Sequence, residues 1–280
     1  MTYYSPSQLA KYMQCGMLWH YHYGLGLRPV VESSSEPQKA GRLMHKLLAT
    51  YYASSCELEA ALTELPQVYA AQGFSRIGNY DYMTEGHFEV ILKNYADEYP
   101  GDKKARVVLQ IEEPLHNDAF RLQGIPDLVM ETNEGLEVWD HKCTTGWLSR
   151  LENRMRYSIQ IPLYAILLSE ELGEPVRRSR INALLIKDNA SNAKSKAEKF
   201  ARFSPDPDRP VLTEFQIGDT LDWFAAIKAE IEARVESGAF YRTPGEHCNW
   251  CDFKGVCHAR TERRREAALS TDFISVEEGA

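Results

Sequence analysis

The sequence predicts an α/β fold with one main sheet, and three observations support this prediction. Helical periodicity dominates the chain up to Tyr99, short β-branched runs begin at Val107, and helical patterns return after Trp139. The 280 residues are 44% hydrophobic and 26% charged, which are ordinary values for a globular protein. We see no internal repeat and no evident linker, so we expect one main core.

The N-terminal third of the chain predicts helices. Ser5 is a suitable N-cap for a first helix, with Pro6 at its first position and its end near Cys15. Leucines at helical spacing predict a second helix over residues 38–54. Further helical pattern fills residues 56–99, which we interpret as a helical insertion that precedes the sheet.

The middle of the chain predicts the sheet. Runs at 107–111, 120–130 and 136–139 are separated by turn sequences, a pattern that is typical of an antiparallel meander. A helix over about 149–172 should follow, with a start or kink near Pro162. The remaining expected elements are a strand over 181–186, a strand within 197–203 and a helix over 217–235.

Composition and charge restrict the class of protein. The net charge of −8 argues against a uniformly basic nucleic-acid coat, but residues 142–210 hold 13 lysines and arginines against 8 acidic residues, which is compatible with a local basic groove. No apolar stretch is long enough to span a membrane, and no secretory signal pattern opens the chain, so we expect a cytoplasmic protein. In a reducing compartment, six cysteines indicate metal binding or reactivity before disulfides.

Two predicted neighbouring strands carry a set of acidic residues and a lysine. Asp127 and Asp140 can converge at matching strand ends on one hard divalent cation, and the i, i+2 spacing places Lys142 on the same face as Asp140. A divalent ion beside an ammonium group supplies the water activation and charge neutralisation that phosphodiester hydrolysis requires. The alternative is a pair of surface aspartates and a solvated lysine. Glu112 and Glu113 could join this site, although we favour a solvated strand end for both.

These residues lie in motifs that resemble the PD-(D/E)xK nucleases, in their RecB-like exonuclease branch. The resemblance implies a restriction-endonuclease-like α/β core, with a central mixed sheet flanked by helices. It also implies catalytic roles for Lys142, Asp127, Asp140, Gln160 and Tyr164. The four motifs occur in the order of that branch, as Gly41–His45, Gly124–Asp127, Val138–Lys142 and Gln160–Tyr164.

The same resemblance implies a metal centre for Mg²⁺ or Mn²⁺. Its ligands would be His45, Asp127, Asp140 and the backbone carbonyl of His141, whose side chain we assign no role. A nitrogen ligand favours Mn²⁺ relative to an all-oxygen site. Without the other motifs, His45 would be an ordinary hydrogen-bonded helix residue.

Gln160 and Tyr164 are four residues apart and therefore share one face of the expected helix. The resemblance implies that this face supports the lysine or contacts DNA. Packing between the helix and the sheet is nearly as good an explanation for Tyr164, and a poorer one for Gln160.

Three cysteines near the C-terminus form a C-x₂-C-x₅-C motif, which is a spacing that chelates a thiophilic metal. With Cys15 as a fourth ligand, Cys248, Cys251 and Cys257 resemble the iron–sulfur staple of AddB-type helicase–nuclease subunits and CRISPR-associated RecB-like exonucleases. The resemblance implies a [4Fe–4S] cluster that joins the N- and C-terminal segments. A structural zinc, with His247, His258 or Cys15 as its fourth ligand, is the alternative.

Together these resemblances imply a metal-dependent DNA nuclease, acting as an exonuclease on single-stranded or frayed DNA ends. Recombination or repair, phage DNA metabolism and CRISPR spacer acquisition are the expected settings. The chain has no Walker A loop, so a helicase, recombinase or CRISPR integrase complex would be a separate partner. We expect one nuclease domain over residues 1–260 and a tail over 261–280. The alternatives are a non-catalytic DNA-end-binding subunit and a zinc-stapled interaction module, which leaves the aspartates and the lysine unexplained.

Overall fold

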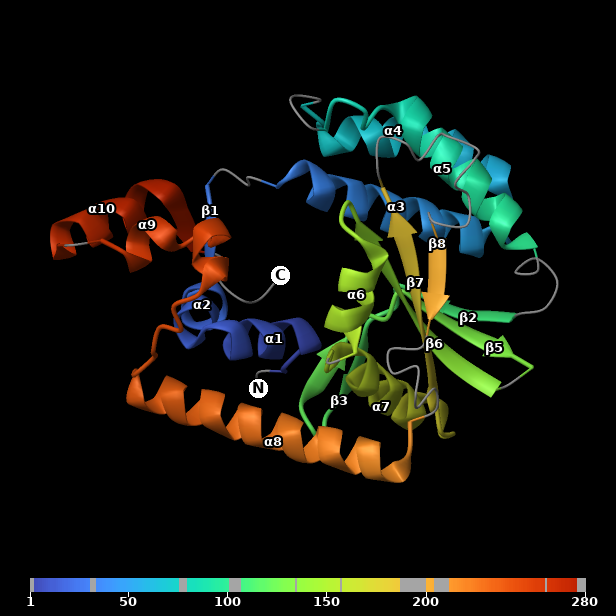
Figure 1. The fold of residues 1–280 in the computed structure, drawn as a ribbon. Helices are drawn as coiled ribbons and strands as arrows, with labels where there is room; N and C mark the ends of the chain where they lie inside the picture. Colours follow the sequence, from blue (N-terminus) through green and yellow to red (C-terminus); the bar gives the residue numbers. More distant parts are fainter. Residues whose placement is uncertain are drawn as a thin grey trace. The chain divides into compact units, whose positions relative to one another are not determined.

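The protein has a mixed α/β fold, seen here in a computed structural model (Figure 1). The chain divides into two compact units, each described by itself below. We call Ser34–Asp118 and Gln123–Gly218 the sheet unit, and Met1–Ser33, Ala119–Leu122 and Asp219–Ala280 the terminal unit. The structure describes residues 3–30, 34–75, 80–100, 107–133, 135–156, 158–186, 200–203, 212–259 and 261–275.

A five-stranded mixed sheet, in the order β2-β5-β6-β7-β8, forms the centre of the sheet unit. β6 follows β5 and pairs antiparallel with it, as the turn sequence between them predicted. β2 also pairs antiparallel with β5, but the two are not consecutive, because two strands of another sheet lie between them in the chain. β7 runs parallel to β6 and β8 antiparallel to β7, which makes the sheet mixed. The strands are β2 (Val107–Ile111), β5 (Leu128–Thr132), β6 (Gly135–Thr144), β7 (Arg178–Leu185) and β8 (Phe200–Phe203).

The strand expected over 120–130 is instead two strands, because Pro126 has no backbone N–H to continue a ladder. β4 (Leu122–Gly124) pairs with β3 (Leu115–Asn117) in a separate two-stranded sheet, and β5 begins after Asp127. Of the strand expected within 197–203, residues 200–203 form β8 and residues 197–199 lie outside the described residues.

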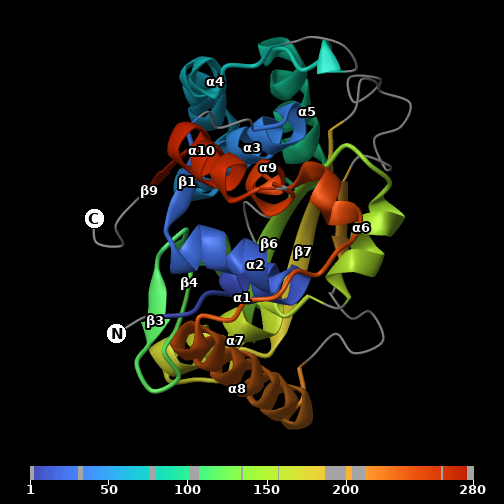
Figure 2. The same cartoon turned by 90° about the vertical axis from the view of Figure 1, so that its left-hand side faces the viewer.

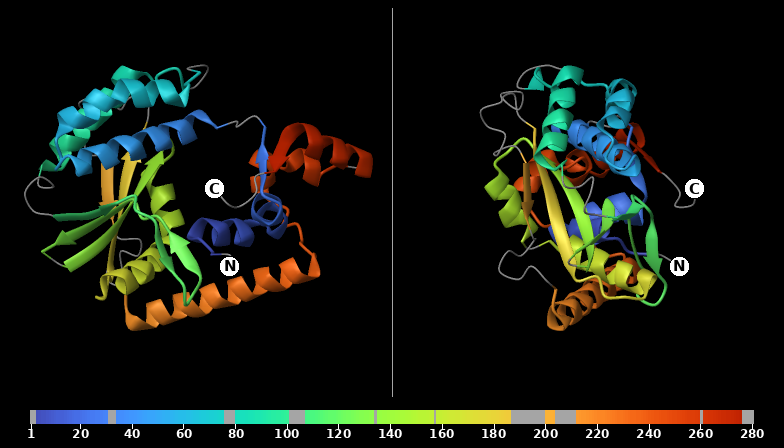
Figure 3. Two further views of the ribbon diagram at one scale, coloured as in Figure 1. Left: turned by 180° about the vertical axis from the view of Figure 1, so that it is seen from behind. Right: turned by 90° about the vertical axis from the view of Figure 1, so that its right-hand side faces the viewer.

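Helices cover both faces of the five-stranded sheet: α3, α4 and α5 lie on one face and α7 on the other (Figure 3). The single helix expected over 149–172 is broken into α6 and α7. Pro162 lies in the first turn of α7, where a missing N–H removes no intrahelical hydrogen bond. The helices are α3 (Glu36–Ala53), α4 (Leu58–Gln72), α5 (Glu85–Glu98), α6 (Leu148–Met155) and α7 (Gln160–Leu172).

The helical segment over 56–99 contributes to the main core of the sheet unit. Phe88 and Ile91 of α5 belong to the same buried cluster as Leu47 of α3 and Trp139 of β6. Cys56, expected within a helical pattern, lies in the turn after α3 with a φ of 63°, and its side chain is buried. This segment therefore stabilises the sheet through apolar burial.

The terminal unit combines both ends of the chain. The Ser5 side chain caps α1 (Pro6–Gln14) by accepting a hydrogen bond from the Gln8 backbone, as the Ser-Pro sequence predicted. β1 (Leu27–Pro29) pairs antiparallel with β9 (Phe273–Ser275), which lies within the segment that was expected to be a tail (Figure 2). Its other helices are α2 (Gly16–Trp19), the π-helix η1 (His20–Gly24), the 3₁₀-helix η6 (Glu246–Trp250), α9 (Lys254–Cys257) and α10 (Glu262–Asp272). α8 (Glu214–Ser237) belongs to this unit from Asp219 onward.

A small apolar core holds β9 in the terminal unit. Phe273 stacks on Phe253 with ring centroids 4.9 Å apart, and both belong to one buried cluster with Tyr21 and Val256. Residues 261–275 therefore pack as part of this unit. No helix in the described part of the chain is both long enough and apolar enough to cross a membrane.

Candidate metal centre and catalytic site

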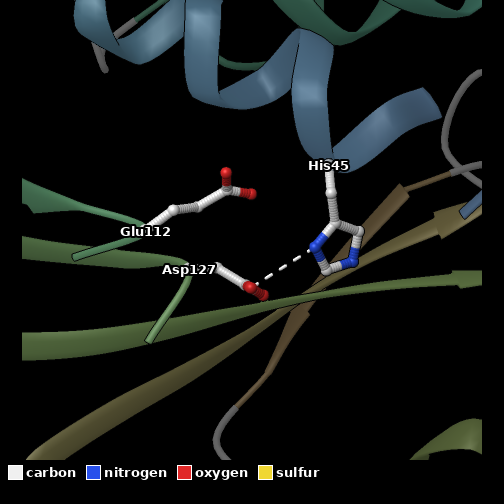
Figure 4. A group of neighbouring side chains, drawn as sticks. All are labelled: His45, Glu112 and Asp127. Carbon is white, nitrogen blue, oxygen red and sulfur yellow. Dashed lines mark ion pairs between the residues drawn. The ribbon is translucent and has the colours of Figure 1, made fainter. Parts of the chain in front are cut away.

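Three side chains from different elements of the sheet unit converge beside the five-stranded sheet (Figure 4). His45 belongs to α3, Glu112 directly follows β2, and Asp127 directly precedes β5. One ligand atom from each of the three lies within 4.8 Å of the other two, and His45 Nδ1 is 3.3 Å from Asp127 Oδ1. Two carboxylates and an imidazole are suitable donors for a divalent cation.

Glu112 reaches this group through a local backbone feature. Its side chain is exposed, as expected at a strand end, and its φ of 48° places the backbone in the left-handed region. The ladder between β2 and β5 also has an irregularity between Val108 and Gln110. Neither feature follows from strand periodicity, so sequence analysis did not favour Glu112 as a member of the site.

Asp127 is fixed by its neighbours on both sides. The His141 backbone N–H donates to Asp127 Oδ2 at 2.5 Å, while Asp127 Oδ1 faces His45. Burial alone would raise the pKa of Asp127, but the interaction with His45 outweighs it, and the pKa is held below its ordinary value. Asp127 is therefore an ionised carboxylate with a fixed orientation.

Asp140 and Lys142 form a close ion pair on β6, as expected for two side chains on one face of a strand. Lys142 Nζ is 2.5 Å from Asp140 Oδ2, and the Asp140 side chain is only 1% exposed. Burial raises the pKa of Asp140, and the nearby Asp127 charge adds to the effect, whereas Lys142 opposes it. Ionised Asp140 is consequently costly in the metal-free protein.

The donor set fits the expected divalent cation. Asp140 Oδ2 has Lys142 as its ion-pair partner but accepts no hydrogen bond of good geometry from the described residues. Asp127 also lies close enough to raise the pKa of Asp140. A divalent cation here would compensate buried negative charge. His45, Glu112 and Asp127 are the side chains whose ligand atoms lie within 4.8 Å of one another, and Asp140, an expected ligand, is not in that group.

Gln160 and Tyr164 share one face of α7, as their spacing predicted. Gln160 Nε2 donates to the Tyr164 hydroxyl at 3.0 Å. Burial raises the pKa of Tyr164 to about 12, and its hydroxyl also interacts with the Ile125 backbone. A Cβ added at Gly124 would lie 2.6 Å from Tyr164 Cε1. Tyr164 therefore packs directly against the segment that leads into Asp127.

The His141 side chain, which sequence analysis left without a role, is engaged on the opposite face of β6. His141 is 2% exposed, and its Nδ1 is 3.0 Å from Asn182 Nδ2. Burial lowers the pKa of His141 to about 3, so the ring is neutral. Tyr52 stacks on this ring. Tyr52 lies seven residues after His45, and this spacing of about two helical turns was a signal in the sequence that the two residues share one face of the helix.

The four cysteines of the expected cluster lie around one cavity of about 130 Å³ in the terminal unit. Burial raises the pKa of Cys251 and Cys257, and each of these thiols is also influenced by Cys15. His247 and His258, the alternative zinc ligands, line the same cavity. Cys56 and Cys143 belong to the sheet unit and take no part in it.

A mixed sheet that presents aspartates and a lysine beside a histidine is the arrangement of a metal-dependent nuclease. Residues 3–258 match the family model of the PD-(D/E)XK nuclease superfamily, and the chain belongs to this superfamily. Its members are generally nucleases that use divalent metals and act on DNA. A comparison with curated proteins gave no match.

Proposed function

We propose that this protein is a metal-dependent deoxyribonuclease that hydrolyses phosphodiester bonds at single-stranded or frayed DNA ends. The observation that carries the proposal is the Lys142–Asp140 pair, 2.5 Å apart, in a sheet unit that also brings His45, Glu112 and Asp127 together. A bound Mg²⁺ or Mn²⁺ would supply Lewis acidity and charge neutralisation at the phosphate.

The residues of the site would have different roles in metal binding and catalysis. Asp127, Asp140 and His45 would hold the cation, with Glu112 and the His141 backbone carbonyl as further ligands. Lys142 would orient the attacking water or stabilise the negative charge that develops on the phosphate oxygens, as a preorganised cation can. Asp140 keeps the Lys142 ammonium in place through their ion pair. Gln160 and Tyr164 support the segment before Asp127.

Membership of the RecB-like exonuclease branch is part of this proposal. The motifs at Gly41–His45 and Gln160–Tyr164 support it, because His45 contacts Asp127 and Tyr164 packs against Gly124. The biological setting would be recombination or repair, phage DNA metabolism or CRISPR spacer acquisition. A helicase, recombinase or integrase complex would be the corresponding partner.

Cleavage of end-labelled DNA tests the proposal. The substrates are linear single-stranded, blunt, frayed and circular single-stranded DNA, each with Mg²⁺, Mn²⁺ or excess EDTA. We expect short products from linear single-stranded and frayed DNA with either metal, and none with EDTA. Equal cleavage of circular DNA would contradict exonucleolytic action, and the absence of metal-dependent cleavage on every substrate would contradict nuclease function.

We further propose that Cys15, Cys248, Cys251 and Cys257 hold a [4Fe–4S] cluster. Four sulfurs around one zinc at about 2.3 Å would lie about 3.8 Å from one another. Within the described residues, these sulfurs form no group in which all members lie within 4.8 Å. The wider arrangement and the cavity of about 130 Å³ favour a polynuclear cluster over a single ion. Its role would be structural, joining residues that are distant in sequence.

Elemental analysis tests the cluster separately from cleavage. Protein purified without oxygen should be brown and contain about four iron and four sulfide per chain. A colourless preparation with about one zinc per chain would contradict the cluster and support the zinc alternative.

A further inference from the structure

A row of polar side chains crosses the sheet from β8 to β6. Arg202 on β8 is the cross-strand neighbour of Asn182 on β7, which is in turn the neighbour of His141 on β6. Arg202 Nε donates to Asn182 Oδ1 at 3.3 Å, and Asn182 Nδ2 lies 3.0 Å from His141 Nδ1. Asn182 is completely buried and His141 is 2% exposed. Water therefore has little access to these hydrogen bonds.

The chemistry of Arg202 determines which group donates and which accepts in each hydrogen bond of this row. A guanidinium group only donates hydrogen bonds, so the carbonyl oxygen of Asn182 must face Arg202. The amide nitrogen of Asn182 then faces His141 and donates to its Nδ1. A neutral imidazole that accepts at Nδ1 carries its proton on Nε2. Arg202 therefore selects the tautomer of a histidine two strands away.

Two tyrosines connect the same arginine to the helix that carries His45. Arg202 donates to the hydroxyls of Tyr95 at 2.9 Å and Tyr52 at 3.2 Å. Tyr95 also accepts from Asn182 at 2.6 Å, so its own proton is directed to Tyr52, 2.7 Å away. Tyr52 lies on α3 two turns beyond His45, and its ring stacks on that of His141 with an interplanar angle of 11°.

The row ends at groups that belong to the candidate metal centre. The His141 backbone donates to Asp127, and the His141 ring meets the His45 ring edge-on at 5.9 Å between centroids. Arg202 is itself held by aromatic rings, with its guanidinium carbon 3.4 Å from the Tyr99 centroid and 4.6 Å from that of Trp139. A rigid arginine thus connects α3 and β6, the elements that carry His45 and the Asp140–Lys142 pair.

We propose that Arg202 is a positioning residue for the metal centre, acting through Asn182 on the His141 tautomer and through Tyr52 on the separation of α3 and β6. This inference rests on the proposed metal-dependent function. By holding α3 beside β6, Arg202 would fix the distance between His45 on α3 and Asp127, whose carboxylate accepts a hydrogen bond from the β6 backbone. His141 is the hydrogen-bonded neighbour of Asp127, and Arg202 acts one step further away, through Asn182. Removal of a hydrogen-bonded neighbour of a metal ligand typically changes metal affinity or activity by about 10- to 100-fold.

Nitrogen-15 NMR of the histidine side chains tests the tautomer in metal-free protein, so this measurement does not depend on nuclease activity. The His141 signals are assigned by their loss in His141→Gln. We expect the Nε2–H tautomer in the wild type. Asn182→Asp preserves the shape of the side chain but replaces the donor to Nδ1 with an acceptor, so His141 should carry a proton on Nδ1. An unchanged His141 spectrum in Asn182→Asp would overturn the proposal.

Manganese binding, measured by calorimetry, tests positioning. Arg202→Met should weaken Mn²⁺ binding by about 10- to 100-fold. The matched control is Arg180→Met, which removes a partly buried arginine of the same sheet that pairs with Glu137; it should bind Mn²⁺ like the wild type. Equal affinities for all three proteins would overturn the proposal.

Two further results, misfolding of Arg202→Met and absence of DNA cleavage, also leave the role of Arg202 testable. If Arg202→Met does not fold, Asn182→Asp is measured in its place, because it changes only one atom of the side chain. If the wild type binds Mn²⁺ but cleaves no DNA, the proposed function fails while both measurements still decide the role of Arg202. Loss of thermal stability without a change in tautomer or Mn²⁺ affinity would show a purely structural role and overturn the proposal.

Discussion

The backbone N–H of His141 donates a 2.5 Å hydrogen bond to Asp127 Oδ2 and so connects the middle of β6 to the residue that precedes β5. One carboxylate oxygen of Asp127 is thereby committed to the backbone, and the other is 3.3 Å from His45 Nδ1. The orientation of this aspartate is set by a neighbouring strand and not by its own rotamer alone. Preorganisation of this kind lowers the cost of binding a cation.

Gly124→Ala should destabilise the sheet unit and disturb the site. The new Cβ would lie 2.6 Å from Cε1 and 3.0 Å from Cδ1 of Tyr164, a buried ring that has little room to move. Overpacking of this kind costs about 1–3 kcal/mol. Chemical denaturation measures the loss, and Gly86→Ala, where an added Cβ meets nothing within 4 Å, is the control. Equal stability of Gly124→Ala and the wild type would contradict the packing described here.

Glu112→Gln should weaken Mn²⁺ binding by roughly 10-fold, because it removes one anionic donor from the group with His45 and Asp127. Calorimetric titration of metal-free protein with Mn²⁺ measures the effect. Glu113→Gln removes the same charge from the adjacent exposed residue and should bind Mn²⁺ normally. A similar loss in both variants would indicate a general charge effect and exclude Glu112 as a ligand.

Asp140→Asn should stabilise the metal-free protein, and more strongly at about pH 8 than at about pH 5. Burial raises the pKa of Asp140, so the folded state binds this proton more tightly than the unfolded chain does. The cost of ionised Asp140 therefore grows as the pH rises from the unfolded pKa, near 3.9, through the raised folded value. We expect a gain on the order of 1–3 kcal/mol, since one pKa unit corresponds to about 1.4 kcal/mol.

Thermal and urea unfolding in EDTA at the two pH values measures this gain. Asp118→Asn, which removes the charge of another aspartate of the sheet unit, is measured beside it as the matched control. A variant Asp140→Asn that is less stable than the wild type at the higher pH would show that the Lys142 pair outweighs the cost of burial.

Cys15→Ser should lose iron and unfold at a lower temperature, because Cys15 is the one cluster ligand from the N-terminal segment. The other three ligands are local in sequence and could retain a damaged cluster weakly. Metal binding contributes to folding free energy, so its loss affects the whole terminal unit. Cys56→Ser should retain iron. Because Cys56 is buried, we expect this variant to melt at a lower temperature than the wild type for reasons of packing alone. Retention of iron by Cys15→Ser and its loss from Cys56→Ser would refute the ligand assignment.

Local patterns predicted the parts of the fold that depend on neighbours in sequence. The shared face of Asp140 and Lys142 follows from the period of a strand, and the antiparallel pairing of β5 and β6 follows from the turn sequence between them. The Ser5 cap and the shared face of Gln160 and Tyr164 are equally local.

Features that depend on tertiary contacts were not predicted. Glu112 enters the metal group through a left-handed backbone and a strand irregularity, and neither has a periodic signature. Arg202 lies 61 residues after His141 in the chain, and only the register of β6, β7 and β8 brings them into one row. A helix start near Pro162 was predicted and is confirmed, since Pro162 lies in the first turn of α7, but the end of α6 at Met155 was not predicted.

The single-turnover rate of DNA cleavage by Lys142→Ala tests the central claim most directly. The Lys142 ammonium is a cation held 2.5 Å from the buried Asp140 carboxylate, and removal of one such group typically lowers the rate by about 100- to 1000-fold. Lys93→Ala, which removes an exposed lysine paired with Glu89 on α5, should cleave like the wild type. We predict a loss of at least about 100-fold for Lys142→Ala, with folding nearly intact. Near-wild-type cleavage by folded Lys142→Ala would contradict the assignment of this site.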